Sequence, residues 1–162
     1  QPEIGWVTVI IVPESKDDKP QPSLVLRREV QRYLADRCDG LVANREDIYV
    51  VGPIYETIDL EFDIYAESID VASNAENQAR DRLKKYFHPL TDGPQDTGWD
   101  FGQGLALSDL YALLEGIAGV DYIENLRFAG DSMKAEQVAK IAPNSLLASG
   151  SFTVNTKTAE NK

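Results

Sequence analysis

Apolar and polar residues alternate most regularly between Ile58 and Tyr65. Successive side chains of a strand point to opposite faces, so this spacing predicts a strand with one apolar and one acidic face. The apolar positions are Ile58, Leu60, Phe62 and Ile64, and the acidic positions are Asp59, Glu61 and Asp63. We therefore expect a sheet that is covered on one side only. This register predicts that Phe62→Asp costs several kcal/mol, whereas Asp63→Asn changes stability by less than about 0.5 kcal/mol.

Two long segments have helical spacing. The first covers residues 22–40, where Ser23 stands at the start and a Gly ends the pattern. The second covers about 71–87, where Ser73 and Glu76 have the S-x-x-E spacing of a capping box. Its apolar residues repeat every four positions, at Ala75, Ala79, Leu83 and Phe87. Both segments therefore predict amphipathic helices that pack against a sheet.

Residues 97–128 predict a glycine-rich loop, a short helix and a strand with almost no slack between them. Ser108 is a favourable N-cap for the helix, and Gly119 stands where a left-handed residue is needed after it. The apolar stripe of the helix comprises Leu110, Leu113, Leu114 and Ile117. In the strand, apolar and polar residues alternate, and Glu124 interrupts the alternation once. Its apolar face is predicted at Val120, Tyr122, Leu126 and Phe128.

The remaining pattern predicts further strands. Residues 6–12 form a β-branched run whose continuous apolarity is typical of a strand buried on both faces. Residues 48–51 predict a short strand closed by Gly-Pro, and 145–156 predict one strand or a hairpin. Residues 131–141 have modest helical character, and the last five residues predict a frayed end.

This order of elements predicts an α+β fold with a mixed sheet and helices packed on one face. A ferredoxin-like or split βαβ arrangement fits the order best. Two sub-lobes fit the pattern as well. We expect a first α/β lobe at 1–52, a second lobe at 53–130 that contains the loop–helix–strand unit, and a C-terminal strand or hairpin with a tail at 131–162.

Composition narrows the classes of partner. The chain has 162 residues and a net charge of −11, which argues against binding to nucleic acid or anionic membranes. Cys38 is the only cysteine, so no intramolecular disulfide can form. No apolar run is long enough to predict a membrane span. The chain starts at Gln1 and its only methionine is Met133, which leads us to expect a piece of a longer polypeptide.

The sequence predicts no catalytic, metal or cofactor site. The acidic strand residues are spaced along one face and do not converge, so we interpret them as a solvated face. His88 fits a helix end, where it can cap carbonyl groups, and Cys38 fits a partly buried small residue. The segment GWDFGQG lacks the pattern of a phosphate loop. Asp100 is the one acid whose aromatic neighbours suggest chemistry, and no second carboxylate can be named for it.

The chain resembles the C-terminal part of baseplate J-like proteins over most of residues 6–128, and more loosely at 145–154. The most specific part is a GW-x-FG…S-x-LY-x-LL…GV-x-x-I-x-x-L series. In this chain the series comprises Gly98, Trp99, Phe101, Gly102, Ser108, Leu110, Tyr111, Leu113, Leu114, Gly119, Val120, Ile123 and Leu126. The larger N-terminal portion of the family is missing from this chain.

The resemblance implies a structural wedge subunit of a contractile phage tail or phage-tail-like injection particle. Such a subunit catalyses no reaction, contacts other wedge and tail subunits in a six-fold baseplate, and is assembled in the cytoplasm. Two alternatives stay open. One is a tail-associated module that recognises a host glycan or protein through Trp99, Phe101 and Tyr111. The other is a hydrolase that uses Asp100. The residues that we expect at an interface or anchoring the loop are Trp99, Asp100, Phe101 and Tyr111.

Overall fold

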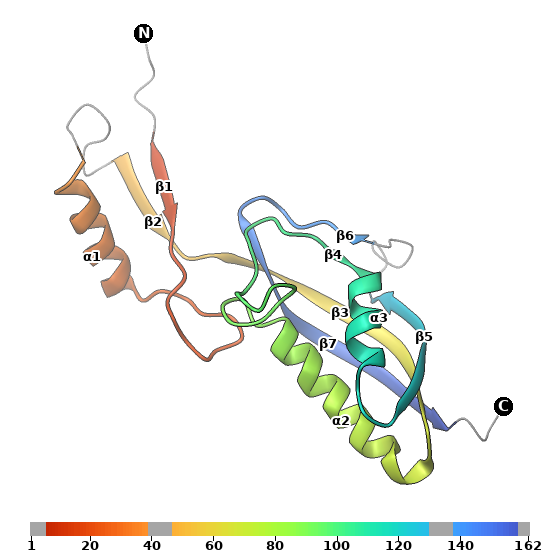
Figure 1. The fold of residues 1–162 in the computed structure, drawn as a ribbon. Coiled ribbons are helices and arrows are strands. Elements are labelled where there is room, and N and C mark those ends of the chain that lie inside the picture. The colour runs from red at the N-terminus through yellow and green to blue at the C-terminus, as the bar shows by residue number, and fades with distance from the viewer. Residues whose placement is uncertain (1–5, 39–46, 130–137, 159–162) are drawn as a thin grey trace. The chain divides into compact units, whose positions relative to one another are not determined.

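The computed structural model describes residues 6–38, 47–129 and 138–158 (Figure 1). Helices pack against strands throughout, which confirms the predicted α+β class. The chain divides into two compact units, Gln1–Ile54 and Tyr55–Lys162. Among the described residues, no helix is both long enough and apolar enough to cross a membrane.

The first unit is a small βαβ motif. Strands β1 (Val7–Ile10) and β2 (Ile48–Val51) pair in parallel, and α1 (Leu24–Ala35) connects them and packs on β2. The helix begins as predicted, because the Ser23 hydroxyl accepts a hydrogen bond of 3.1 Å from the backbone N–H of Leu26. Gln31 fastens the helix to the sheet by donating a hydrogen bond of 2.8 Å to the carbonyl of Ile48.

The prediction that residues 6–12 form a doubly buried strand was wrong. Only Val7–Ile10 are in β1, both of its first two residues are exposed, and Trp6 beside it is 74% exposed. A continuous apolar run is typical of a strand with neighbours on both edges and layers on both faces. In the described part of the chain, β1 pairs with β2 alone. The run therefore forms the strand but has little to pack against.

The second unit is built on a three-stranded sheet of order β5-β3-β7. Strand β3 (Ile54–Ala66) is central, β5 (Val120–Phe128) pairs with it antiparallel, and β7 (Ser145–Thr158) runs parallel to it (Figure 1). Helices α2 (Ile69–Tyr86) and α3 (Leu107–Glu115) contact each other and pack on β7 and β5 respectively. Short strands β4 (Leu105–Ala106) and β6 (Val138–Ala139) form a separate antiparallel pair.

The predicted face of β3 is confirmed. Ile58, Leu60, Phe62 and Ile64 are all buried under the helices. The α2 positions at every fourth residue are buried as well, at Ala75, Ala79, Leu83 and Phe87. Both patterns contribute to the core of this unit, because burial removes their apolar surfaces from water.

Strand β5 differs from its prediction. Its pairing with β3 is irregular near both ends, and Asn125 has a φ of 54° in the left-handed region. Each such bulge shifts the alternation by one residue. As a result Ile123 is buried beside Val120, Leu126 and Phe128, and Tyr122 lies on the opposite face. The prediction that Tyr122 shares the apolar face was therefore wrong.

The serine caps predicted for α2 and α3 were wrong. The N-cap of α2 is Ser68 rather than Ser73, and that of α3 is Ala106 rather than Ser108. Serine and glutamate at helical spacing are common inside exposed helix faces, so the pair at 73 and 76 marked no boundary. The φ of Gly119 is 87°, so this residue is left-handed as predicted. It does not end the helix, however, because α3 ends at Glu115 and its C-cap is Gly116.

The C-terminal part contains one long strand and no hairpin. Gly150 lies inside β7. Glycine is needed there because a Cβ at this position would lie 2.6 Å from the carbonyl oxygen of Ile58. The glycine therefore permits close strand packing and does not mark a turn. Residues 138–139 form β6, where a helix was predicted. Residues 131–137 of that predicted helix and residues 159–162 of the predicted frayed end lie outside the described residues.

Candidate functional site

The loop after α2 is fastened to the helix by Trp99. This side chain is 5% exposed, and its Nε1–H donates a hydrogen bond of 2.8 Å to the carbonyl of Tyr86. Its ring meets Tyr86 edge-on at 5.4 Å and stacks with Phe87 at 6.2 Å. Its backbone N–H donates to the carbonyl of Pro89 at 3.0 Å. The last carbonyl groups of a helix lack hydrogen-bond donors within the helix. Trp99 supplies a donor to one of these carbonyl groups at the end of α2.

The tight turn before Trp99 requires glycine. Gly98 has a φ of 92°, and a Cβ there would lie 2.6 Å from the carbonyl oxygen of Pro89. Its N–H donates a hydrogen bond of 2.6 Å to the carbonyl of Asp92. The glycine pattern of the central segment thus serves close backbone packing.

The other residues that we predicted at an interface are more exposed to solvent than Trp99. Phe101 is 41% exposed, Tyr111 is half-buried on α3, and Asp100 is exposed. The backbone N–H of Asp100 donates to Oε1 of Gln103 at 3.0 Å. Because Trp99 is buried, it cannot join Phe101 and Tyr111 in an exposed aromatic platform. No group of three or more His, Cys, Asp or Glu within the described ranges could hold a metal ion.

His88 closes the turn that follows α2. Its Nδ1 lies 3.0 Å from the hydroxyl of Thr91 and accepts a hydrogen bond of 3.4 Å from the N–H of Leu90. The ring therefore bonds to groups downstream, whereas the sequence predicted that it caps upstream carbonyl groups.

The acidic face of β3 is a hydrogen-bonded network, and its interpretation as a simple solvated face was wrong for Asp63. This residue is only 7% exposed. Its carboxylate accepts hydrogen bonds from Asn125 at 2.7 Å, Asn155 at 2.9 Å and Lys157 at 2.9 Å. These bonds lower the pKa of Asp63 to about 2, with Lys157 as the largest cause. Asp63 therefore joins β5, β3 and β7 across the open face.

The neighbouring acids on this face are engaged in the same way. Asp59 accepts hydrogen bonds from the backbone N–H of Ser151 at 2.6 Å and from its hydroxyl at 2.7 Å. Glu61 pairs with Arg127 of β5 at 2.8 Å. Each acid thus has its own partner on an adjacent strand, and the carboxylates do not converge on one point.

Replacing Asp63 with asparagine is expected to lower the free energy of unfolding at pH 7 by about 1–3 kcal/mol, because a buried carboxylate that accepts three hydrogen bonds is replaced by a neutral amide. This reverses the near-neutral effect expected from the sequence. The pKa of Asp63 falls from 3.8 to about 2 on folding. Its contribution is therefore present above about pH 4 and is lost as the pH falls through 2. Urea unfolding from pH 7 to pH 2 should show the difference between wild type and variant shrinking at the acid end.

Asp121→Asn is the matched control for this experiment. Asp121 is exposed on β5 and the change removes the same charge. We expect an effect within about 0.5 kcal/mol. Equal losses in the two variants would contradict the role of the Asp63 network.

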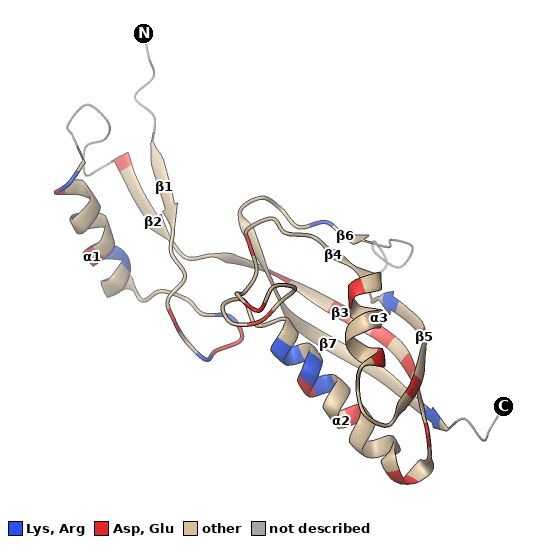
Figure 2. Cartoon of the chain, viewed as in Figure 1, with Lys and Arg blue, Asp and Glu red and all other residues tan. Residues whose placement is uncertain are grey.

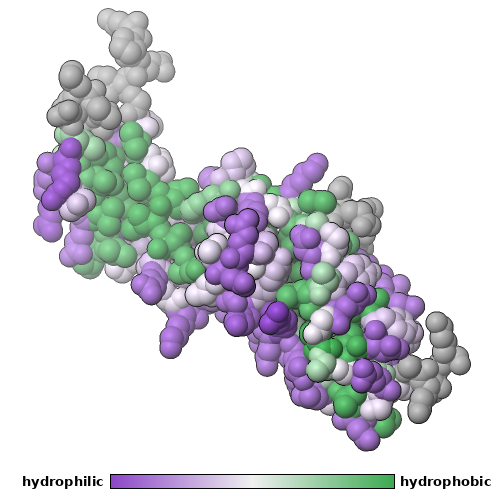
Figure 3. Space-filling model, viewed as in Figure 1, coloured by the Kyte–Doolittle hydropathy of each residue, from purple (hydrophilic) through white to green (hydrophobic). Residues whose placement is uncertain are grey.

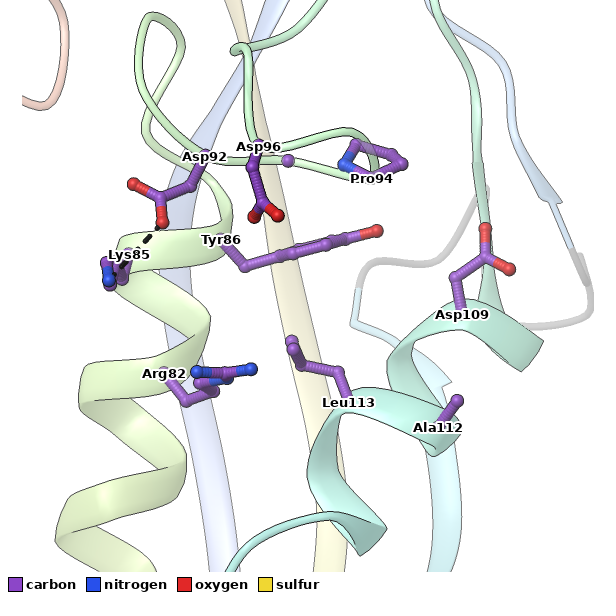
Figure 4. Close-up of a pocket in the computed structure, with 10 residues that line it drawn as sticks. Arg82, Lys85, Tyr86, Asp92, Pro94, Asp96, Asp109, Ala112 and Leu113 are labelled. Carbon is purple, nitrogen blue, oxygen red and sulfur yellow. Dashed lines mark ion pairs between the residues drawn. The ribbon is translucent and has the colours of Figure 1, made fainter.

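A cavity of about 500 Å³ lies between α2, the 92–96 loop and α3 (Figure 4). We call it the Tyr86 pocket. Tyr86 lies between Asp96 and Arg82, and its hydroxyl points toward Asp109 (Figure 4). The side chains that give the pocket its charge and its aromatic wall are Arg82, Lys85, Tyr86, Asp92, Asp96 and Asp109. No sequence motif connects the three segments that line this pocket, so the pocket was not predicted.

Exposed apolar side chains gather on the first unit (Figure 3). They come from β1 and the residue before it, from β2, from the first residue of β3 and from α1, which has no buried residue. The large ones are Trp6, Val7, Leu24, Val25, Tyr33, Tyr49 and Ile54. Scattered apolar residues are normal on a protein surface, whereas a concentration of this kind is typical of interaction surfaces.

Charge is divided unevenly between the units. Residues 55–162 carry a net charge of −9, and residues 1–54 carry −2. Acidic residues follow β3 and β5, and basic residues cluster on the second half of α2 (Figure 2). The second unit therefore attracts positively charged partners, and the first has little electrostatic preference.

Comparison with known proteins gives a likeness in fold. No protein-family model matches the chain, and no curated protein matches it. A chain in the six-fold symmetrised cryo-EM structure of the anti-feeding prophage baseplate matches with a TM-score of 0.64 and 16% sequence identity. The match covers 91% of this chain and 30% of that chain. The chain therefore has the fold of a segment of that baseplate protein.

Proposed function

We propose that this chain is a structural domain of a baseplate wedge subunit in a contractile phage tail or phage-tail-like particle. In this role it joins neighbouring wedge and tail subunits of a six-fold assembly and catalyses no reaction. The observation that carries the proposal is the fold likeness to a baseplate protein over 91% of this chain. The resemblance in the 98–126 series points to the same kind of particle and rests on the sequence alone.

The arrangement of polar and apolar groups supports a structural role. The carboxylates on the open face of the second unit pair with neighbouring strands and fix the sheet. The first unit presents uncharged apolar side chains to its surroundings. Exposed apolar patches of this kind mark sites of interaction with other proteins. A glycan-binding role has less support, because Trp99 is buried and cannot stack on a sugar.

Localisation in purified particles tests this proposal. An antibody against the chain, used for immunogold microscopy on contractile particles from the source organism, should label one end of the sheathed tail. Deleting the coding region for residues 6–158 should remove assembled baseplates, and an Asp121→Asn chain should restore them. Normal particles without this region, or a chain found only as a free monomer, would overturn the proposal.

A further inference from the structure

The Tyr86 pocket has an excess of negative charge that its own residues do not neutralise. Lys85 pairs with Asp92 at 3.6 Å. Asp96 and Asp109 then remain, and neither forms an ion pair with any residue that the structure describes. Only Arg82 opposes them in the pocket lining. The pocket also belongs to the unit that carries the net charge of −9, so its field attracts cations.

The aromatic wall of the pocket suits a cation too. Burial raises the pKa of Tyr86 to about 12, with a further contribution from the charge of Asp109. The phenol is neutral at physiological pH, as tyrosine ordinarily is, and its ring offers a π face. Lys and Arg side chains are attracted to such faces when they lie within about 6 Å of the ring centre. Asp96 on one side of Tyr86 and Asp109 beyond its hydroxyl place acceptors around the ring (Figure 4).

The acids of the 92–96 loop are held in place before any ligand arrives. Asp96 has a φ of 55°, and its N–H donates a hydrogen bond of 3.5 Å to the carbonyl of Gly93. The loop is closed by the bond from Gly98 to Asp92 and is fastened to α2 by Trp99. A site that is already ordered loses less conformational entropy on binding. The buried tryptophan thus contributes to the pocket by fixing its rim.

We propose that the Tyr86 pocket binds an arginine side chain from a basic segment of a partner protein. The planar guanidinium can stack on Tyr86 while its N–H groups donate to Asp96 and Asp109, a combination that lysine cannot match. The volume of about 500 Å³ exceeds that of one side chain and leaves room for the residues that flank it. That the partner is a neighbouring particle subunit rests on the proposed function, whereas the choice of arginine rests on the pocket alone.

Titration of the ¹⁵N-labelled chain with short blocked peptides tests the proposal. The probes are Gly-Arg-Gly-Arg-Gly, its lysine counterpart and its citrulline counterpart, which has arginine's shape without its charge. We expect the arginine peptide to shift the amide signals of Tyr86, Ala112 and Leu113, and to bind at least threefold more tightly than the lysine peptide. The citrulline peptide should not bind. Shifts spread over the open face of β3, or equal binding of arginine and lysine peptides, would overturn the proposal.

Matched charge variants separate a built pocket from general attraction by an acidic protein. Asp96→Asn with Asp109→Asn should weaken arginine-peptide binding at least tenfold. Asparagine tolerates the left-handed backbone at position 96, so the loop should stay folded. The control, Asp100→Asn with Asp121→Asn, removes the same charge at exposed positions outside the pocket and should change binding less than twofold. Equal weakening in the two double variants would show non-specific attraction and contradict the pocket.

Failure of this inference differs from failure of the proposed function. If the chain labels baseplates but the peptides do not bind, the wedge role stands and the pocket proposal is wrong. If arginine peptides bind at the pocket but the chain is absent from particles, the pocket stands and its partner is not a baseplate subunit.

Discussion

Phe62→Asp is expected to cost about 5 kcal/mol or more and to unfold the second unit. Phe62 is 1% exposed on the covered face of β3. Losing the ring alone costs about 3–5 kcal/mol in a core, and a buried carboxyl group without a partner adds to that loss. Domains are stable by only about 5–15 kcal/mol. The variant should therefore lose the cooperative unfolding transition in urea when followed by circular dichroism.

The control uses the same strand and the same new side chain. Thr57 is exposed on β3, so Thr57→Asp introduces the carboxyl group into water and should shift stability by less than about 0.5 kcal/mol. A Phe62→Asp protein that unfolds at the same urea concentration as Thr57→Asp would show that the faces of β3 are assigned wrongly.

The sequence was sufficient to predict the faces of β3 because one local rule decides them. In a strand the period is two, so a run of alternating residues assigns every side chain to a face. The role of Asp63 could not be predicted from the alternating residues of β3 alone. Its partners Asn125, Asn155 and Lys157 lie 62, 92 and 94 residues further along the chain. Only the pairing of β3 with β5 and β7 brings them together, so the carboxylate looked solvated.

Two other elements show how local patterns mislead. The bulge at Asn125 reverses the alternation of β5, and the spacing of the apolar residues does not predict this bulge. The apolar run at β1 correctly predicts a strand but not its burial, because burial depends on how many strands and helices surround it. In both cases the type of element followed from the residues, and its environment followed from tertiary contacts.

The candidate site was predictable only in its first component. The burial of Trp99 was predictable because a large ring between glycines is usually held by packing. In the structure the ring packs against the end of α2. The Tyr86 pocket was beyond prediction for a physical reason. Its charges come from a helix, a loop and a second helix, and single aspartates at positions such as 96 and 109 have no spacing that distinguishes them from solvated residues.

Trp99→Ala is expected to lower the free energy of unfolding of the second unit by about 3–5 kcal/mol. The change removes a buried ring that contacts Tyr86 and Phe87 and leaves a cavity in its place. It also leaves the carbonyl of Tyr86 without the Nε1–H donor. Trp99→Phe keeps most of the ring and loses the donor, so it should cost less, about 1–3 kcal/mol. The order wild type, Phe, Ala should appear in urea unfolding midpoints.

The chain supplies its own control, because it contains two tryptophans and they have opposite environments. Trp6 is 74% exposed, so Trp6→Ala should leave the unfolding of the second unit unchanged. In a Trp6→Phe protein, Trp99 is the sole tryptophan, and its emission should move to longer wavelength when the 92–99 loop releases it. If Trp99→Ala is no more destabilising than Trp6→Ala, the loop does not depend on this ring. The fixed rim of the Tyr86 pocket would then lose its physical basis, because Asp96 would lack the anchor that holds it against α2.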